Sequence, residues 1–389
     1  MKSYSKIFVL LSLCMITISL QSCTKMLGNR LGRSIRCNVT GVATKGSTIT
    51  TSSSDPGKFP ITTDGFKTIA YAEERWYNNE SAVYTDAGIF FGKDDVLYNK
   101  LGDGKWHFSG EHKWLNDIQL TFWSWDMATD GIIGTGAGKV TQPSYTLGTK
   151  KLSFSYQLPT HTAANTDAES QVDMVFAGNF EKRVFDDDGN MTESHRNSGG
   201  KTDNTKSEYI DIHFYHALSE VMFAVSPADG TFDKTVKIKD ITISGISPKG
   251  DCTFDGKDFT WNNLSETASF TQTYNADFST YSNSKKDFTG WTLGQYTKDK
   301  GLPTEAAHDI YSCNEKFFLI PQTCGSSARL IVTFVNGSIE STSEAMINGD
   351  SWKPGYYYKY KINYVASGEE VTFGILLVEF EEIPVPISY

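Results

Sequence analysis

The chain of 389 residues lacks the local signatures of catalysis. It contains no Gly-x-Ser-x-Gly elbow, no phosphate-binding glycine loop and no His-Glu-x-x-His motif. Asp and Glu residues are numerous, but no local pattern nominates a carboxylate pair of the kind that glycosidases use. These absences predict a protein that is not an enzyme and that carries no cofactor.

Patterns that bind metal ions are missing as well. No cysteine stands in a Cys-x-x-Cys or zinc-like spacing. His213 and His216 are three residues apart, which places them on opposite faces of a strand, and we expect a buried, hydrogen-bonded His216. Asp186–Asn190 begins like a calcium loop, but its glycine is misplaced for an EF-hand. We therefore expect no metal site.

Positive charge is scarce. The formal net charge is −10, and it becomes −12 when Lys2 and Lys6 are removed with residues 1–22. A chain this acidic repels phosphate backbones, which argues against a nucleic-acid partner. Runs of helix-favouring residues are also scarce, whereas Phe (24), Tyr (19) and Trp (8) are abundant, so the composition favours strands.

Only one long apolar run is present, near the N-terminus. Ile7–Leu20 follows Lys2 and Lys6 and is too short to span a bilayer comfortably, so residues 1–22 are typical of a signal peptide. Leu20-Gln21-Ser22-Cys23 resembles the lipobox of bacterial lipoproteins, in which the cysteine becomes the acylated first residue. We expect lipid on Cys23 to tether the mature protein to a membrane.

Four cysteines remain after Cys14 leaves with the signal peptide and Cys23 is lipidated: Cys37, Cys252, Cys313 and Cys324. Outside the cytoplasm such residues can form disulfides, but four cysteines allow three pairings and the sequence does not choose among them. We interpret these cysteines as structural.

Residues 24–54 contain basic residues, among them Arg36 and Lys45, but no Asp or Glu. Within this segment Ile35, Cys37 and Val39 alternate with polar residues, which indicates a short strand. One interpretation, slightly favoured by the sequence alone, is a spacer that holds the protein body off anionic lipid. The other is a protease-accessible leader that carries a removable strand.

Alternation with a period of two residues recurs along the rest of the chain and predicts an all-β protein built from antiparallel sandwiches. Leu152–Leu158, Ile210–His216 and Tyr356–Tyr364 are the clearest examples. Residues 186–208 hold one large apolar side chain, Met191, and we expect a long surface loop there, near a domain boundary. We therefore divide the chain into a signal peptide (1–22), a lipidated basic leader (23–45) and two domains (46–205 and 206–389).

Residues 274–312 lose the strand pattern and are dotted with aromatic residues. Exposed rings stack on sugars or on peptide side chains, and loops between rigid strands often carry binding sites. The segment is therefore the best candidate for a ligand surface, formed by Phe278, Tyr281, Trp291 and Tyr296. The alternative is that these rings pin a long loop to the protein body.

The segment 366–389 begins at the hinge-like Ala366-Ser367-Gly368, and its apolar residues alternate from Val371 to Leu377. Spacing alone favours an ordinary final strand. The alternative is a donor strand that enters a groove of another subunit, where main-chain hydrogen bonds provide strength and alternating side chains provide register.

Five segments resemble the fimbrillin family and follow one another in the family's order. They are Trp106–Trp125, which bears several tryptophans, Gln171–Ala177 (QVDMVFA), Phe214–Ser219 (FYHALS), Phe318–Gln322 (FLIPQ) and Trp352–Tyr358 (WKPGYYY). Any one of them alone is a weak signal. Five in this order behind a lipobox are fairly specific, and they cover most of the mature chain.

The resemblance implies a subunit of type V pili with two tandem transthyretin-like antiparallel β-sandwich domains. It implies export as an outer-membrane lipoprotein and display at the cell surface in a fimbrium. In that family a trypsin-like protease removes the lipidated leader with the first strand, and the opened groove accepts a donor strand from another subunit. Cutting after Arg36 would sever a strand at 35–39, whereas cutting after Lys45 would release it whole, so geometry favours Lys45.

The expected function is therefore that of a structural or adhesive pilus subunit, whose partners are other subunits and a host glycan or protein. The alternative is an anchored outer-membrane lipoprotein that binds glycan through residues 274–312. Stalk, accessory and tip roles stay open, because Glu379–Tyr389 lacks the usual C-terminal end of a stalk subunit.

Overall fold

The protein is described as a computed structural model. The residues that it describes are 34–41, 66–78, 81–91, 97–100, 106–108, 112–146, 149–159, 171–198, 201–203, 209–227, 236–277, 311–367 and 370–380. Strands dominate these residues, which confirms the all-β prediction, and the helix in this part of the chain is the short α2 (Met127–Gly131). No helix in the described ranges is long and apolar enough to cross a membrane.

The described residues form two compact units that interleave along the sequence. The first unit contains the residues up to Gly41, those between Ile61 and Met127, and Ala177–Phe214. The second unit contains Ala128–Phe176 and the residues from Tyr215 onward. Each unit is therefore assembled from separate stretches of chain, and the proposed division into domains 46–205 and 206–389 stays a prediction.

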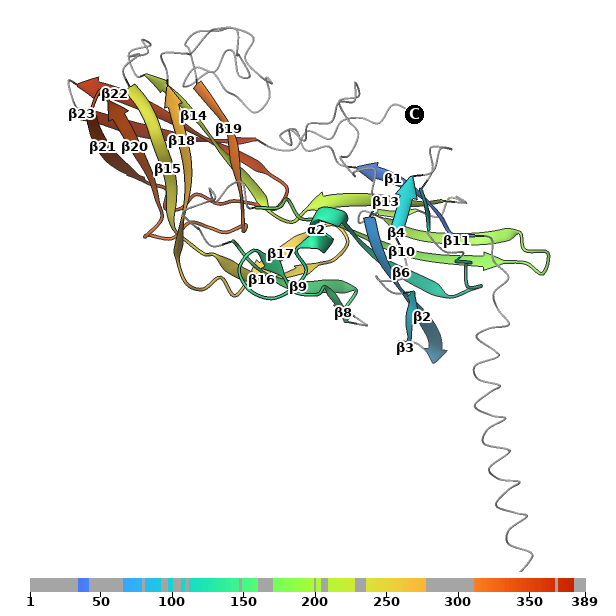
Figure 1. The fold of residues 1–389 in the computed structure, drawn as a ribbon. Helices are drawn as coiled ribbons and strands as arrows, with labels where there is room; N and C mark the ends of the chain where they lie inside the picture. Colours follow the sequence, from blue (N-terminus) through green and yellow to red (C-terminus); the bar gives the residue numbers. More distant parts are fainter. Residues whose placement is uncertain are drawn as a thin grey trace, which may run out of the picture. The chain divides into compact units, whose positions relative to one another are not determined.

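The first unit is built on a ten-stranded sheet whose strand order is β12-β11-β10-β13-β1-β5-β4-β2-β3 (Figure 1). The tenth strand, β6, pairs with both β10 and β2, so that the path of paired strands from β10 to β2 closes on itself. The strands are β1 (Arg36–Gly41), β2 (Phe66–Asn78), β3 (Ser81–Phe91), β4 (Leu97–Lys100), β5 (Trp106–Phe108), β6 (Gln119–Asp126), β10 (Val175–Phe185), β11 (Met191–Ser198), β12 (Lys201–Asp203) and β13 (Tyr209–His216).

Large aromatic side chains fill the core of this unit. All six inner residues of β6 are buried, so both faces of that strand are covered. Arg183 on β10 is also buried, and its guanidinium carbon lies 3.9 Å from the ring centroid of Trp114 and its Nη2 lies 3.5 Å from a carboxylate oxygen of Glu181. The ring and the carboxylate compensate the charge that burial removes from water.

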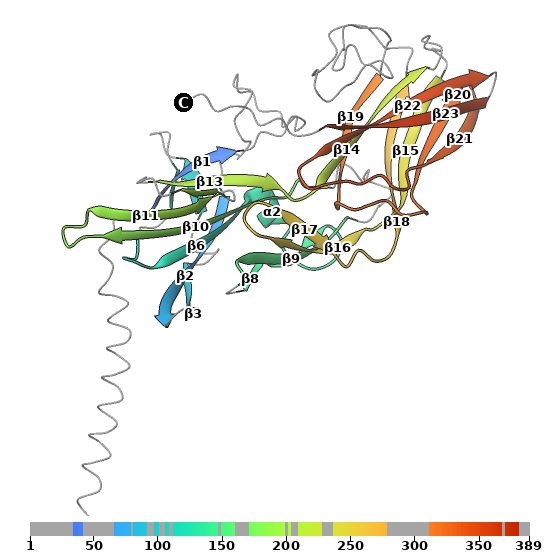
Figure 2. The same ribbon diagram turned by 180° about the vertical axis from the view of Figure 1, so that it is seen from behind.

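The second unit contains a β-sandwich of two four-stranded sheets, ordered β19-β14-β22-β23 and β18-β15-β20-β21 (Figure 2). Phe334 of β20 packs on Tyr364 of β22, with the ring centroids 5.9 Å apart. The strands are β14 (Ser219–Pro227), β15 (Val236–Ile246), β18 (Ala268–Asp277), β19 (Tyr311–Leu319), β20 (Arg329–Asn336), β21 (Ile339–Met346), β22 (Tyr357–Ser367) and β23 (Glu370–Phe380).

Alternation in the sequence predicts this core well. Tyr358, Tyr360, Ile362 and Tyr364 of β22 are all buried, as the period of two requires. The turn before β22 contains Gly355 with φ of +74°, a conformation that glycine adopts without strain.

A smaller five-stranded sheet completes the second unit. Its order is β17-β16-β9-β7, with β8 also paired to β9. The strands are β7 (Lys139–Val140), β8 (Ser144–Thr146), β9 (Lys151–Gln157), β16 (Lys249–Phe254) and β17 (Phe259–Asn262). Leu152, Phe154 and Tyr156 of β9 are buried, and the residues between them face the opposite side of the sheet.

The prediction of a long surface loop at residues 186–208 is wrong. β11 pairs antiparallel with β10 over Asn179–Phe185, and β12 pairs with β11 in turn. The Asp186 Oδ1 accepts hydrogen bonds from the backbone N–H groups of Asp188 and Asn190, which closes the turn between the first two strands. Main-chain hydrogen bonds to β10 order this polar segment, although it has few apolar side chains to bury.

The histidine and cysteine predictions are tested in part. His216 Nδ1 lies 2.7 Å from a carboxylate oxygen of Asp173, and the side chain is mostly buried, as expected. Among the described residues, no group of three or more His, Cys, Asp or Glu is placed to hold a metal ion. Cys252 and Cys324 are buried free thiols, and burial raises the pKa of Cys324 to about 12. A disulfide between these two is therefore excluded.

Candidate functional site

Of the residues that the sequence nominates, Arg36 alone lies in the described part of the chain. It is the first residue of β1, and its side chain is exposed. The lipidation candidate Cys23, the cleavage candidate Lys45 and the aromatic residues Phe278, Tyr281, Trp291 and Tyr296 all lie outside the described residues.

The strand predicted at Ile35–Val39 is confirmed as β1, and it is an inner strand of the first unit. It runs parallel to β13 with six residue pairs in register, from Arg36 opposite Tyr209 to Gly41 opposite Phe214. On its other side it pairs with β5 through Cys37 and Trp106. Both views show β1 beside β13 (Figures 1 and 2). The segment thus has a sheet neighbour on each side.

The start of β1 is fixed by main-chain contacts with the segment that follows β5. The Ile35 N–H donates a hydrogen bond to the carbonyl oxygen of His112 at 2.8 Å. Ser34 and Lys113 form an isolated antiparallel bridge beside it. These contacts are made by backbone groups, so the alternation that predicts a strand at Ile35–Val39 does not identify its partners.

Core-facing side chains anchor β1, one in the strand itself and one at Ile35, the residue just before it. Ile35 is 3% exposed and Cys37 is fully buried, whereas Arg36 between them is exposed. Removing an isoleucine side chain from water contributes about 1.5–3 kcal/mol to stability. β1 is therefore held by apolar burial as well as by its ladder of backbone pairs.

The neighbouring β13 presents a matching apolar face. Ile210, Ile212 and Phe214 are buried, and the register places Cys37 opposite Ile210. The Phe214 ring meets Phe66 of β2 edge-on, with the centroids 5.2 Å apart. Loss of β1 would uncover the N–H and C=O groups of β13 and part of this apolar face. A sheet edge in that state is a template for another strand.

The predicted final strand is also present. β23 pairs antiparallel with β22 along its whole length, from Tyr357 opposite Phe380 to Ser367 opposite Glu370. It lies at the edge of its sheet. In this structure residues 370–380 are therefore paired within their own chain, as spacing alone suggests.

Comparison with known proteins supports one family. Residues 77–376 match the sequence model of a family described as fimbrillin-like, which is most of the chain. No curated protein matches the chain.

Several solved structures align with most of this chain, at low TM-scores. A fimbrial assembly protein of Parabacteroides distasonis has 9% identity and a TM-score of 0.32, with 90% of this chain and 99% of that chain covered. A candidate cell adhesion protein of Bacteroides ovatus has 11% identity and a TM-score of 0.42, with 90% and 98% covered. A candidate cell adhesion protein of Bacteroides uniformis has 11% identity and a TM-score of 0.40, with 88% and 98% covered. Values this low do not carry a functional assignment, which depends on the family match.

Proposed function

Because the chain belongs to the fimbrillin-like family, a family of structural and adhesive proteins and not of enzymes, we propose that it is a pilus subunit assembled by strand exchange. The strand that leaves is β1, and the strand that replaces it comes from another subunit. The single observation that carries this proposal is that β1 is an inner strand, with Cys37 fully buried opposite Ile210. Its removal creates the slot that a donor needs.

Proteolysis triggers the exchange in this proposal. The strand ends at Gly41, so a cut after Lys45 leaves the whole of β1 on the departing fragment. A cut after Arg36 would leave Cys37–Gly41 attached to the body and paired with β13. Lys45 is therefore the processing site that geometry favours, and Arg36 is the second candidate.

The anchor and the location follow from the N-terminal sequence. Lipid on Cys23 would hold the unprocessed subunit in the outer membrane, with residues 24–35 as the connection to β1. Cleavage would then release the body to the cell surface, where it joins a fimbrium. The donor in this scheme is an extended segment of a neighbouring subunit, for which the corresponding tail 366–389 is the candidate in this chain. The assignment of two tandem transthyretin-like domains is also part of this proposal.

The competing function is a lipoprotein that stays anchored and binds glycan through residues 274–312. Treatment of the exported protein with trypsin, followed by electrophoresis with and without boiling, separates the two. Strand exchange predicts loss of the leader, an N-terminus at Gly46 in sequencing, and ladders that boiling dissolves. A monomer that keeps its leader and binds a glycan array would support the anchored lipoprotein and refute the pilus.

A further inference from the structure

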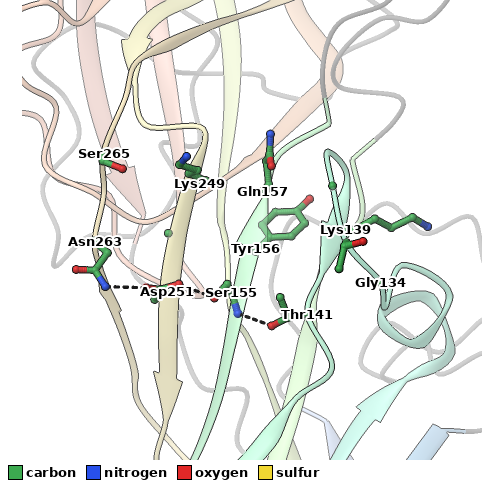
Figure 3. Close-up of a pocket in the computed structure, with 13 residues that line it drawn as sticks. Gly134, Lys139, Thr141, Ser155, Tyr156, Gln157, Lys249, Asp251, Asn263 and Ser265 are labelled. Carbon is green, nitrogen blue, oxygen red and sulfur yellow. Dashed lines mark hydrogen bonds between the residues drawn. The ribbon is translucent and has the colours of Figure 1, made fainter.

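A pocket of about 330 Å³, lined mostly by residues with polar side chains, opens on the five-stranded sheet of the second unit (Figure 3). Residues 134–141, which include β7, form one side of it, and β9, β16 and the residues just after β17 form the rest. A cavity of this volume is at the lower end of the range found for small-molecule sites, which suits a ligand of one or two sugar rings. No residue of the pocket belongs to β1 or to the first unit.

A row of hydrogen-bonded polar groups crosses the pocket from strand to strand (Figure 3). Asn263 donates from Nδ2 to Asp251 Oδ2 at 2.6 Å, and the Ser155 hydroxyl donates to Asp251 Oδ1 at 2.5 Å. The Ser155 N–H then donates to the Thr141 hydroxyl oxygen at 2.8 Å. These four residues come from segments up to 122 positions apart. The pairing of β9 with β16 and of β16 with β17 brings Ser155, Asp251 and Asn263 together.

Asp251 is the fixed anion of this row. The hydrogen bonds from Asn263 and then from Ser155 lower the pKa of Asp251 below its ordinary value, so the carboxylate is ionised at neutral pH. Each carboxylate oxygen can accept about two hydrogen bonds, and one is used at each oxygen. An oriented, exposed carboxylate thus retains acceptor capacity for a ligand hydroxyl.

Three further polar side chains of the lining are available to a ligand. The Lys139 ammonium, the Gln157 carboxamide and the Ser265 hydroxyl line the pocket and make no hydrogen bond with any side chain or backbone group in the described ranges. Together they offer donors, and in Gln157 and Ser265 also acceptors. A hydroxyl-rich ligand uses both kinds of group at once.

The charges around the pocket cancel. Lys139 and Lys249 are cationic, and Asp251 is anionic. Lys249 Nζ is also paired with a carboxylate oxygen of Glu266, the residue after the lining residue Ser265, at 2.5 Å. Two positive and two negative groups leave no net attraction for a phosphate or a carboxylate ligand. The balance favours an uncharged ligand over an anionic one.

We propose that this pocket binds a neutral saccharide of one or two rings, with its hydroxyl groups placed between the Asp251 carboxylate and the Gln157 carboxamide. This inference is independent of strand exchange, since it concerns other residues and needs no second subunit. It gives the protein an adhesive site that is separate from the aromatic segment 274–312.

The test uses the full-length chain and free neutral sugars, namely glucose, galactose, mannose, N-acetylglucosamine and lactose, observed by saturation-transfer difference NMR. Asp251→Asn keeps the shape of the side chain and removes its charge. Asp258→Asn is the matched control, because Asp258 is exposed on the hairpin between β16 and β17 and does not line the pocket. Gln157→Leu is the second pocket variant, in case Asp251→Asn does not fold.

We expect at least one neutral sugar to bind the wild type and Asp258→Asn equally. Loss of a hydrogen bond to a charged group weakens affinity about tenfold or more, so Asp251→Asn should bind at least that much more weakly. Absence of binding by all five sugars would overturn the proposal. So would a sugar that binds Asp251→Asn and Gln157→Leu like the wild type but is lost in Trp291→Ala, since the site would then be the aromatic segment. A monomer that never polymerises but binds sugar refutes strand exchange and leaves the pocket standing.

Discussion

Replacing Ile35 with alanine should weaken the hold of the first unit on β1. The Ile35 side chain is 3% exposed, and its N–H is bonded to the carbonyl of His112. The substitution removes apolar contacts and leaves this main-chain bond in place. It therefore isolates the side-chain contribution to strand retention.

The expected magnitude follows from burial. Truncating a buried isoleucine to alanine costs roughly 2–5 kcal/mol, depending on how far the surroundings relax. Since 1.4 kcal/mol is a factor of ten, even the lower figure corresponds to about a 30-fold weaker retention of the strand. In the uncleaved chain the substitution lowers the free energy of unfolding of the first unit by the same amount, so the variant should also melt at a lower temperature.

The assay follows the leader after it is cut. A chain with a specific protease site engineered at Lys45 is cleaved, and the leader that stays bound is measured by size-exclusion chromatography and mass spectrometry without boiling. We expect the wild type to retain the fragment and Ile35→Ala to release it far sooner. Ile339→Ala on the edge strand β21 is the matched control, because Ile339 is half-buried in the second unit. Equal retention by wild type and Ile35→Ala would refute the reasoning that buried side chains hold β1 in place.

Three further predictions concern the second unit. Gly245→Ala should lower the free energy of unfolding by several kcal/mol in chemical denaturation, because a Cβ there would lie 2.3 Å from the Ser327 carbonyl oxygen. Gly349→Ala is the control, since its φ is also positive but no atom lies within 4 Å, and it should lower the free energy of unfolding far less. Equal decreases for the two variants would contradict this geometry. Burial raises the pKa of Asp350 above its ordinary 3.8, so the ionised carboxylate destabilises the fold. In urea titrations, the stability of the wild type relative to Asp350→Asn should fall as pH rises from 3.8 through the raised pKa and should then level off. A stability difference that does not change with pH would contradict this prediction. Because Cys324 is buried and its thiol pKa is raised, iodoacetamide at pH about 8 should leave it unmodified in the native chain and should modify it once the chain unfolds. Mass spectrometry measures the modification. Rapid labelling of the native chain would refute this prediction, because it would show that the thiol is accessible.

The sequence predicts strands best where one face of a sheet is buried. The alternation at Tyr358–Tyr364 and at Ile210–Phe214 reports burial directly, and both segments are strands with those residues in the core. The short strand at Ile35–Val39 could be identified for the same reason. Its neighbours β13 and β5 could not, because the partner of a strand is chosen by topology.

Polar strands escape the same reasoning. The hairpin of β10 and β11 continues into a segment with almost no large apolar residues, and ladder hydrogen bonds leave no trace in side-chain polarity. The sequence does not reveal the pocket, because Ser155 and Asp251 are 96 residues apart and become neighbours only through the pairing of β9 with β16. Local spacing contains no information about such a meeting.

Two strands, β10 and β13, carry the backbone from one compact unit into the other without a break in their extended conformation, at Phe176–Ala177 and Phe214–Tyr215. If the proposed exchange places a donor strand beside β13, tension applied to that strand would be passed to β13 and then along its covalent backbone into the second unit. Covalent bonds do not dissociate under such a force. The weakest connection would therefore be the non-covalent contact between the docked strand and β13.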